Sequence, residues 1–390
     1  MALNDAVIVA ANRTAVGKAK KGALVNVRPD TLGGIVLADV VKRVDFDPLL
    51  IEDLQMGCAM PEGEQGTNIG RIAIHCAGLP NDIPASTVNR FCSSGVQSIA
   101  IIANRIQVGE IQAGIGAGTE SMTMVPMGGN KIVPNPELAE TFPDAYISMG
   151  HTAENVAKRY GITRDQQDEW AVVSNDRASK AIAAGKFKSQ IVPVTAWQYD
   201  NGQRREFTFD TDEGPRAGTT KEVLAKLKPA FSTTGSVTAG NSSQMSDGAA
   251  AVLLTSAELA KKQNLKPLAR FVTFAVAGCH PDEMGIGPAL AIPKALKQAG
   301  LKVEDIDLFE INEAFASQFL YSGQKVGIDL NKVNVNGGAI ALGHPLGCTG
   351  AKLTTQLVYE MAERKSRYGI VSMCIGGGMG AAAIYENLQR

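Results

Sequence analysis

The chain has 390 residues, of which 45% are hydrophobic and 20% are charged. A composition of this kind is typical of a well-packed globular protein with roughly two to three domains. The 38 Lys and Arg and the 39 Asp and Glu leave a net charge of -1. This balance excludes binding of nucleic acid or an anionic membrane through the overall field of the protein, so an acidic ligand must be met locally.

The cysteines, the histidines and the chain ends predict a reduced cytoplasmic protein. Six cysteines and four histidines are scattered through the chain, without a Cys-x-x-Cys pair and without the Cys/His spacing of a zinc site. We therefore expect free thiols and no metal site. The longest apolar runs, such as residues 6–11, are shorter than the ~20 residues that span a bilayer. We expect no secretory leader and no membrane span, and Leu388-Gln389-Arg390 is not a peroxisomal address.

The first 120 residues alternate strand-like runs with helical spacing. Strands are predicted at residues 6–11, 54–58, 85–88 and 111–116, and helices at residues 31–44, 68–77 and 96–106. The strand at 111–116 is expected to enter a glycine-rich turn. Strands that alternate with helices indicate a mostly parallel sheet covered on both faces.

Residues 121–238 break this pattern and predict an insertion without a sheet of its own. A proline- and glycine-rich stretch is followed by helices predicted at 154–160 and 164–184 and by a polar stretch at 199–220. The strand expected at 249–255 could return to the first sheet.

The last 120 residues repeat the order of elements in the first. Strands are predicted at residues 268–276, 306–311, 332–336, 368–374 and 381–386, and helices at residues 289–299, 313–326 and 348–364. The repeat indicates an internal duplication. We therefore divide the chain into an N-terminal half (1–120 with about 239–267), an insertion (121–238) and a C-terminal half (268–390). Loops that follow equivalent strands of two such halves converge, which would bring Cys92 and His344 together.

Cys92 lies where the strand at 85–88 gives way to a helix. The free N–H groups and the positive dipole end of a helix favour thiolate over thiol, so Cys92 is a candidate nucleophile. The alternative is a buried cysteine that packs as a small hydrophobic residue.

Three further residues occupy positions suited to chemistry. His344 lies in a glycine-dense turn before a helix, and a neutral imidazole there can take the proton of Cys92. Cys374 ends a strand before a run of glycines and is either a second reactive thiol or core packing. Asn312 ends another strand, where its amide either holds a water or a carbonyl oxygen or caps a helix.

Together these segments resemble the thiolase family, and most of all its bacterial degradative 3-ketoacyl-CoA thiolases (acetyl-CoA acyltransferases). The matching motifs are Val88 to Gly95, Asn312-Glu313-Ala314-Phe315, Gly343 to Gly350, Cys374 with its glycines, Thr238 to Ser243, Met284 to Pro288, and Met149 to Glu154. The resemblance implies an α/β fold of two pseudo-twofold-related βαβαβαββ halves in a five-layered αβαβα arrangement, with a loop-rich insertion.

The resemblance also implies roles for the candidate residues. Cys92 would attack the keto carbon of a 3-ketoacyl-CoA after activation by His344, and Cys374 would protonate the departing acetyl-CoA carbanion. The enolate oxygen would be held by His344 and a water on Asn312. The tetrahedral oxyanion would be held by the backbone N–H groups of Cys92 and Gly376, because donors aimed at developing charge must come from unencumbered backbone. Glu313 is expected to orient its neighbours.

The same resemblance assigns the contacts to substrate and the partners. Arg216 and Ser243 match CoA-contacting positions, and six residues match positions near the pantetheine and acyl group, namely Met149, Phe231, Ala239, Met284, Ala314 and Phe315. The resemblance thus implies that coenzyme A is a substrate. No tightly bound cofactor is expected. The expected partners are acyl-CoA and a second copy in a homodimer or homotetramer, and a β-oxidation partner subunit stays open.

Several alternatives stay open at this point. Ser93-Ser94 after the nucleophile and Ser148 before Met149 favour the degradative branch over an acetoacetyl-CoA thiolase that condenses two acetyl-CoA. A ketosynthase of the same fold would have no counterpart of Cys374, and a non-catalytic lipid-binding relative would lack one of the three reactive groups. The Gly-x-Gly-x-Gly run at 114–118 is misplaced for a dinucleotide-binding turn.

Overall fold

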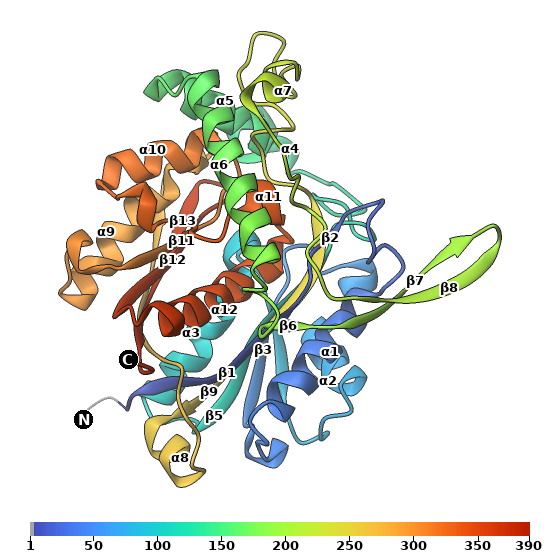
Figure 1. The fold of residues 1–390 in the computed structure, drawn as a ribbon, viewed down its shortest axis with the longest axis vertical. Helices are drawn as coiled ribbons and strands as arrows, with labels where there is room; N and C mark the ends of the chain where they lie inside the picture. The colour runs from blue at the N-terminus through green and yellow to red at the C-terminus, as the bar shows by residue number, and fades with distance from the viewer. Residues whose placement is uncertain (1–3) are drawn as a thin grey trace.

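The computed structural model describes residues 4–390, and an 11-stranded sheet runs through them (Figure 1). The main path of the sheet is β11-β12-β13-β10-β1-β9-β5-β3-β4, with β2 (Gly17–Lys18) beside β9 and β6 (Ile191–Val192) beside β1. The strands of the path are β1 (Ala6–Thr14), β3 (Asp53–Gly57), β4 (Ala85–Val88), β5 (Ala113–Ser121), β9 (Ser246–Ser256), β10 (Ala269–Gly278), β11 (Leu308–Ile311), β12 (Tyr368–Ile375) and β13 (Met379–Asn387).

The sheet consists of two halves with the same pairing pattern. In the first half β3 pairs in parallel with β4 and β5, and β9 lies antiparallel between β5 and β1. In the second half β11 pairs in parallel with β12, and β13 lies antiparallel between β12 and β10. The halves meet through the antiparallel pairs Val7–Arg270 and Ile8–Ala269. The predicted duplication and the predicted return of the strand near 249–255 to the first sheet are therefore confirmed.

The counterpart of β4 in the second half is almost absent, so the strand predicted at 332–336 is wrong. Only a single bridge joins Phe309 to Val333. The next residue, Asn334, has φ +45°, and a left-handed residue cannot continue a strand. The Asn334 side chain instead bonds the backbone N–H and carbonyl of Ile311 at 2.9 and 2.8 Å.

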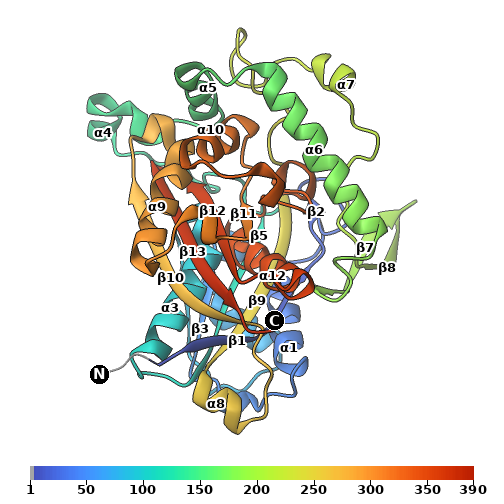
Figure 2. The same ribbon diagram turned by 60° about the vertical axis from the view of Figure 1, so that its left-hand side comes forward.

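Six principal helices complete five layers, as predicted from the family resemblance (Figures 1 and 2). One outer layer has α1 (Pro29–Lys42) and α2 (Ile69–Cys76), the middle layer has α3 (Ser94–Gln107) and α12 (Leu346–Arg364), and the other outer layer has α9 (Gly287–Ala299) and α10 (Ala316–Val326). Strand β1 serves two layers at once, since Val7 and Val9 pack with α1 whereas Ala6 and Ile8 pack with α3. This alternation is that of a strand covered on both faces.

Glycines let the middle helices lie directly on β5, which corrects the prediction of a glycine-rich turn after residue 116. The strand continues to Ser121. A Cβ on Gly116 would lie 2.5 Å from Ile99 Cα, and one on Gly118 would lie 2.3 Å from the Gly347 carbonyl oxygen. These glycines are needed for close helix packing rather than for chain reversal.

Replacement of Gly116 by alanine is expected to lower the free energy of unfolding by about 1–3 kcal/mol, because the new methyl group meets rigid helix backbone. Urea unfolding measures this change. Gly278→Ala is the matched control, because the nearest atom to its new Cβ is 4.0 Å away. Equal losses in the two variants would contradict the packing explanation.

The insertion carries α5 (Met149–Tyr160) and α6 (Arg164–Ala183), together with the short helices α4 (Pro136–Thr141) and α7 (Lys221–Ala225). Helix α6 begins where Thr163 and Gln166 form a reciprocal capping box. The expectation that the insertion has no sheet is wrong, because β7 (Val194–Asp200) and β8 (Gln203–Phe209) pair as a two-stranded antiparallel hairpin that projects from the body (Figure 1). The proposed division into 1–120 with 239–267, 121–238 and 268–390 stays a prediction.

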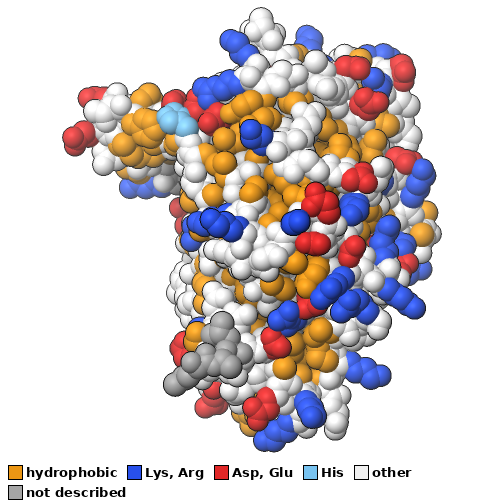
Figure 3. Space-filling model, turned by 90° about the vertical axis from the view of Figure 1, so that its left-hand side faces the viewer, with side chains coloured by type: hydrophobic (Ala, Val, Ile, Leu, Met, Phe, Trp, Pro, Cys, Tyr) orange, Lys and Arg blue, Asp and Glu red, His pale blue; other side chains and the backbone are white. Residues whose placement is uncertain are grey.

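The apolarity of the helices and the charge of the surface agree with the expectations from composition. No helix within residues 4–390 combines the length and apolarity that crossing a bilayer requires. On the face shown in Figure 3, acidic and basic side chains are interspersed around exposed hydrophobic ones. This face therefore offers no extended field of one sign for a polyanion.

Candidate active site

Cys92 is presented by a strained turn between β4 and α3. The backbone of Phe91 has φ +43°, which is uncommon for a residue with a side chain and marks a turn held by its surroundings. Ser94 Oγ accepts from the Arg90 N–H at 2.8 Å and donates to the Phe91 carbonyl at 2.7 Å. Residues Phe91–Ser93 form one 3-10 turn, and α3 follows at Ser94, so the predicted place of the cysteine at a helix start is confirmed.

The resting protonation state of Cys92 differs from the prediction. Burial raises the pKa of its thiol to about 11, although the backbone N–H groups of Gly376 and of Cys92 itself lie within hydrogen-bonding reach of the sulfur and lower that pKa. Desolvation thus outweighs the helix terminus. Cys92 is a thiol at neutral pH and requires a base to react.

Cys374 and Gly376 come from the end of β12 and the loop after it. Burial, followed by the influence of Cys92, raises the pKa of Cys374 well above its usual range. Gly377 and Gly378 have φ +80° and +85°, which reverses the chain directly after Gly376. Two thiols and one backbone donor thus share a single water-poor space.

His344 and Asn312 form a second group in contact with each other. The His344 Nε2 lies 3.2 Å from Asn312 Nδ2, and its Nδ1 lies 2.6 Å from Thr349 Oγ1. Thr349 Oγ1 also donates its only proton to the Pro345 carbonyl at 2.9 Å. The hydroxyl must therefore accept from Nδ1–H, which leaves the lone pair on Nε2.

Burial sets the charge of this histidine. Desolvation, followed by the nearby Lys352, lowers the pKa of His344 to about 3. The imidazole is neutral at physiological pH, as a base that takes the Cys92 proton must be. Asn312 Oδ1 is buried and has no bonding partner within the described chain, so it can accept from a water.

The elements that carry the two groups pack against each other in the middle helix layer. Helix α12 and strand β12 both pack against the turn that carries Cys92. Leu346, two residues after His344, packs in one cluster with Cys92. A Cβ on Gly95 would lie 2.7 Å from the Ala351 nitrogen, so the starts of α3 and α12 touch through backbone. This contact supports the meeting of Cys92 and His344 expected from the duplication, which stays a prediction.

Glu313 lies outside the helix in which it was predicted, because α10 begins only at Ala316. Its buried carboxylate accepts from Trp170 Nε1 at 2.9 Å, Ser174 Oγ at 2.7 Å and Asn334 Nδ2 at 2.8 Å. It therefore joins α6 of the insertion to the loop behind Asn312. This geometry supports the expected orienting role of Glu313.

Glu120 is a site residue that the sequence reasoning missed. Its carboxylate is fully buried and accepts from the N–H groups of Ala59 and Gly347 at 2.7 Å each and from Gln65 Nε2 at 2.8 Å. It fixes the first turn of α12 beside the Cys92 pocket. The available signal was an acidic residue at the end of an apolar strand. Because the strand was predicted to end at residue 116, Glu120 was not recognised as part of it.

Most residues matched to the substrate gather around Cys374. Met149, Met284, Ala314 and Phe315 form one apolar cluster with this thiol. Phe231 meets Phe315 edge-on, with ring centroids 5.9 Å apart.

The remaining residues matched to the substrate lie outside this apolar cluster. The Ser243 N–H donates to the Ala314 carbonyl at 2.9 Å, and Ala239 is exposed. Arg216 is exposed on the insertion, and its backbone N–H bonds Asn175 Oδ1 at 3.0 Å. The Arg216 side chain is therefore open to solvent, and its contact with a CoA phosphate stays a prediction.

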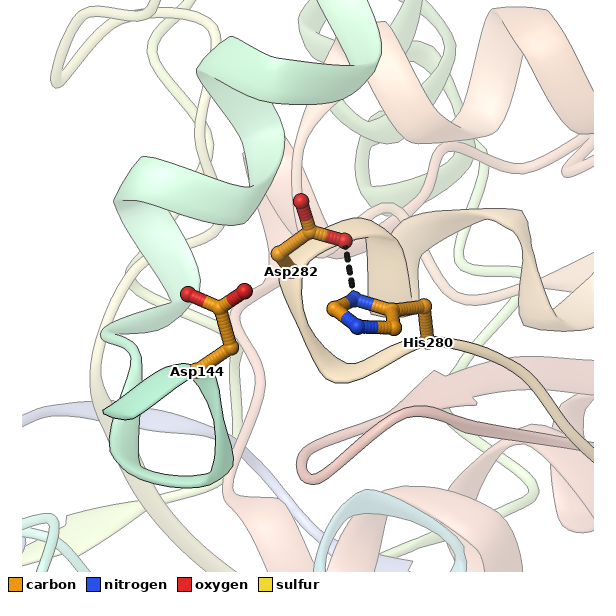
Figure 4. Close-up of side chains that lie close together, drawn as sticks. All are labelled: Asp144, His280 and Asp282. Atoms are coloured by element: carbon orange, nitrogen blue, oxygen red, sulfur yellow. Dashed lines mark hydrogen bonds and ion pairs between the residues drawn. The ribbon is translucent and has the colours of Figure 1, made fainter. Parts of the chain in front are cut away.

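A cluster of charged residues lies behind the apolar cluster. Asp144, His280 and Asp282 offer ligand atoms within 4.8 Å of one another, and Figure 4 shows Asp144 facing the bonded pair His280–Asp282. Arg159 of α5 already pairs with Asp282. The cluster is therefore better explained as an ion-pair network that fastens α5 to the Pro281–Ile286 turn, and the absence of a metal site stays a prediction.

Asp282→Asn is expected to destabilise the protein by about 0.5–1 kcal/mol at pH 7 and by less at low pH. The Arg159 guanidinium, followed by the His280 ring, holds the pKa of the Asp282 carboxyl below its usual range. A depressed carboxyl pKa contributes stability above the unfolded-state pKa, and this contribution is lost as the pH falls through the folded-state pKa. Urea unfolding of both proteins between pH 7 and pH 3 tests this, and a difference that does not shrink toward pH 3 would contradict it.

Family models match nearly the whole chain. Residues 6–258 match the thiolase N-terminal domain, and residues 265–387 match the thiolase C-terminal domain. The chain is 55% identical to the 3-ketoacyl-CoA thiolase of Bacillus subtilis, an alignment that covers 98% of this chain and 100% of that protein. It is 49% identical to the peroxisomal 3-ketoacyl-CoA thiolase A of Mus musculus, over 98% of this chain and 91% of the mouse protein.

Solved structures agree with the sequence relatives. The dimeric peroxisomal thiolase of Saccharomyces cerevisiae superposes with a TM-score of 0.89 at 44% identity, over 98% of this chain and 97% of the yeast chain. The Bacillus anthracis acetyl-CoA acetyltransferase superposes with a TM-score of 0.90 at 42% identity, over 99% of both chains. The chain therefore belongs to the thiolase family and contains both of its domains.

Proposed function

We propose that the protein cleaves 3-ketoacyl-CoA with coenzyme A to acetyl-CoA and an acyl-CoA shortened by one acetyl unit, as in fatty acid β-oxidation. One observation carries the proposal. The buried thiol of Cys92 raises the pKa of the buried Cys374 thiol, and the Gly376 N–H lowers that of Cys92, in a chain that aligns over 98% of its length with proteins named 3-ketoacyl-CoA thiolase.

The first half-reaction begins with proton transfer from Cys92 to Nε2 of His344. The sulfur bonds the keto carbon, and the resulting oxyanion is held by the N–H groups of Cys92 and Gly376. The carbon–carbon bond then breaks, and its electron pair passes to the acetyl-CoA enolate. The enolate oxygen is held by His344 Nε2–H and a water on Asn312, and Cys374 donates its proton to the carbon.

The second half-reaction restores each group. The Cys374 thiolate takes the proton of the incoming CoA thiol, and the CoA thiolate attacks the acyl group on Cys92. Cys92 leaves as a thiolate and recovers its proton from His344. Coenzyme A is thus a substrate that enters and leaves, and no tightly bound cofactor is required.

Two alternatives use the same fold. Run backwards, the same groups condense two acetyl-CoA, and one structural neighbour is named acetyl-CoA acetyltransferase. Ser93-Ser94 and Ser148, together with relatives named 3-ketoacyl-CoA thiolase, favour degradation. A non-catalytic lipid-binding role is disfavoured because both thiols, the imidazole and the amide are all present around one site.

The assembly and location follow as proposals. The Saccharomyces cerevisiae neighbour is described as dimeric, which supports a homodimer here. A homotetramer, a β-oxidation partner subunit and a cytoplasmic location stay predictions.

The test compares initial thiolysis rates on acetoacetyl-CoA and a long-chain 3-ketoacyl-CoA, with Cys92→Ala as the blank. Faster cleavage of the long substrate supports fatty acid degradation. Activity confined to acetoacetyl-CoA would replace this proposal with short-chain acetyl-CoA metabolism.

A further inference from the structure

Lys352 is a buried charged residue that the mechanism above does not use. It lies on α12 with 1% of its surface exposed, and its Nζ donates to the Gly343 carbonyl at 3.1 Å. Burial, followed by repulsion from Arg13, lowers the pKa of Lys352 to about 8, so most of its population is charged at neutral pH. A buried ammonium is costly unless its contacts serve the fold or the site.

The charged groups around Lys352 do not neutralise it directly. Asp212 is committed to Arg13 through two bonds of 2.8 Å and also accepts from the Val16 N–H at 2.8 Å. Glu310 faces Lys352 from β11, and burial raises the pKa of that carboxyl to about 8. Cys348, one turn earlier on α12, is the remaining titratable neighbour, and burial raises its pKa to about 12.

The Gly343 carbonyl belongs to the peptide group that precedes the imidazole of His344. The N–H of the same peptide donates to the Gln244 carbonyl at 3.1 Å and to Ser246 Oγ at 3.2 Å. The peptide is therefore held at both ends, by Lys352 on one side and by the segment before β9 on the other. Gly343 has φ +87°, so the backbone here needs such support to keep one conformation.

We propose that Lys352 is a positioning residue for His344: its buried ammonium holds the Gly343–His344 peptide so that Nε2 stays against Asn312. This inference rests on the proposed function, in which a neutral His344 receives the Cys92 proton. Lys352 touches neither thiol in this scheme and acts only through His344.

Two variants separate the hydrogen bond from the charge. Lys352→Gln retains a donor for the Gly343 carbonyl without the charge, whereas Lys352→Met removes both. Thr354→Val is the matched control, because Thr354 is equally buried on α12 but bonds Tyr385 on a different face. All three proteins are compared with wild type for thiolysis kinetics, for thermal stability and for the titration of His344.

The titration needs no substrate. The chain has only four histidines, so ¹³C-labelled imidazole signals can be followed by NMR and His344 assigned with a His344→Asn variant. We expect a higher His344 pKa in Lys352→Gln and Lys352→Met than in wild type, because a neighbouring cation disfavours imidazolium. We expect kcat to fall on the order of 10- to 100-fold in Lys352→Met, less in Lys352→Gln, and not in Thr354→Val.

The outcomes distinguish this inference from the proposed function. A wild-type protein without thiolysis activity would defeat the proposed function, while the His344 titration would still test Lys352. Equal losses of kcat and stability in both Lys352 variants, with an unmoved His344 pKa, would overturn the inference in favour of a purely structural lysine. If Lys352→Met does not fold, the His344 titration of Lys352→Gln alone supports the inference when it shifts and overturns it when it does not.

Discussion

Cys92→Ala is expected to lower kcat/KM for thiolysis on the order of 10⁴-fold or more, because the covalent intermediate can no longer form. The backbone N–H groups of Gly376 and Cys92 lower the pKa of the Cys92 thiol, and such donors suit an oxyanion formed on a carbon bound to its sulfur. Steady-state kinetics measure the loss. Mass spectrometry after brief mixing with substrate should find an acyl group on the Cys92 peptide of wild type and none in the variant.

Cys76→Ala is the matched control for this experiment, since Cys76 is exposed on α2, away from the site. It should retain wild-type kinetics and the acyl-enzyme. A Cys92→Ala protein with substantial turnover, or an acyl group found on another cysteine in wild type, would refute the assigned nucleophile.

Cys374→Ala is expected to lower kcat by about 10²- to 10⁴-fold while leaving Cys92 open to alkylation by iodoacetamide. The reason is that Cys374 supplies and removes a proton but forms no bond to the acyl group. Rates of thiolysis and of alkylation of the Cys92 peptide, measured on the same preparations, separate the two thiols: Cys374→Ala loses thiolysis but keeps alkylation at Cys92, whereas Cys92→Ala loses both.

Cys348→Ala controls for the packing cost, because Cys348 is also a buried thiol with a raised pKa but lies in the core between α3 and α12. It removes the same atoms as Cys374→Ala. Similar activity in both variants would show that the effect at Cys374 comes from packing rather than from proton transfer.

The resting site has no charged member among its three reactive side chains. Burial raises the pKa of both thiols and lowers that of His344 to about 3, so all three are neutral near pH 7. Charge therefore develops only when Cys92 passes its proton to His344. The N–H groups of Cys92 and Gly376 and the contacts of His344 are already in place. They can therefore stabilise the developing charge without reorganisation of the site.

Much of the fold could be predicted because it depends on periodicity and on local chemistry. The order of strands and helices follows from apolar spacing, and the place of Cys92 follows from a strand that ends four residues before it and a helix pattern that begins four residues after it. The candidate residues Cys92, Asn312, His344 and Cys374 lie at strand ends or helix starts, where side chains of an α/β sheet converge. The duplication of elements was visible because both halves keep the same order.

The errors arose where a tertiary contact overrode a local preference. Gly116 and Gly118 indicated a turn but lie within β5, because α3 and α12 pack on them. Residues 332–336 have strand-like composition, yet Asn334 turns away to bond Ile311 and Glu313. Neither contact partner is near in sequence, so no local pattern carries the information.

The sequence by itself determined which residues could react and the order of the elements that carry them. Only the tertiary structure decided their protonation states, because the desolvation that outweighs a helix dipole at Cys92 depends on neighbours from both halves of the chain. The same holds for Glu120 and Lys352, whose roles come from bonds to Gly347 and Gly343. The role of a buried charged side chain depends on the groups around it. Those groups come together only when the two halves of the chain have packed.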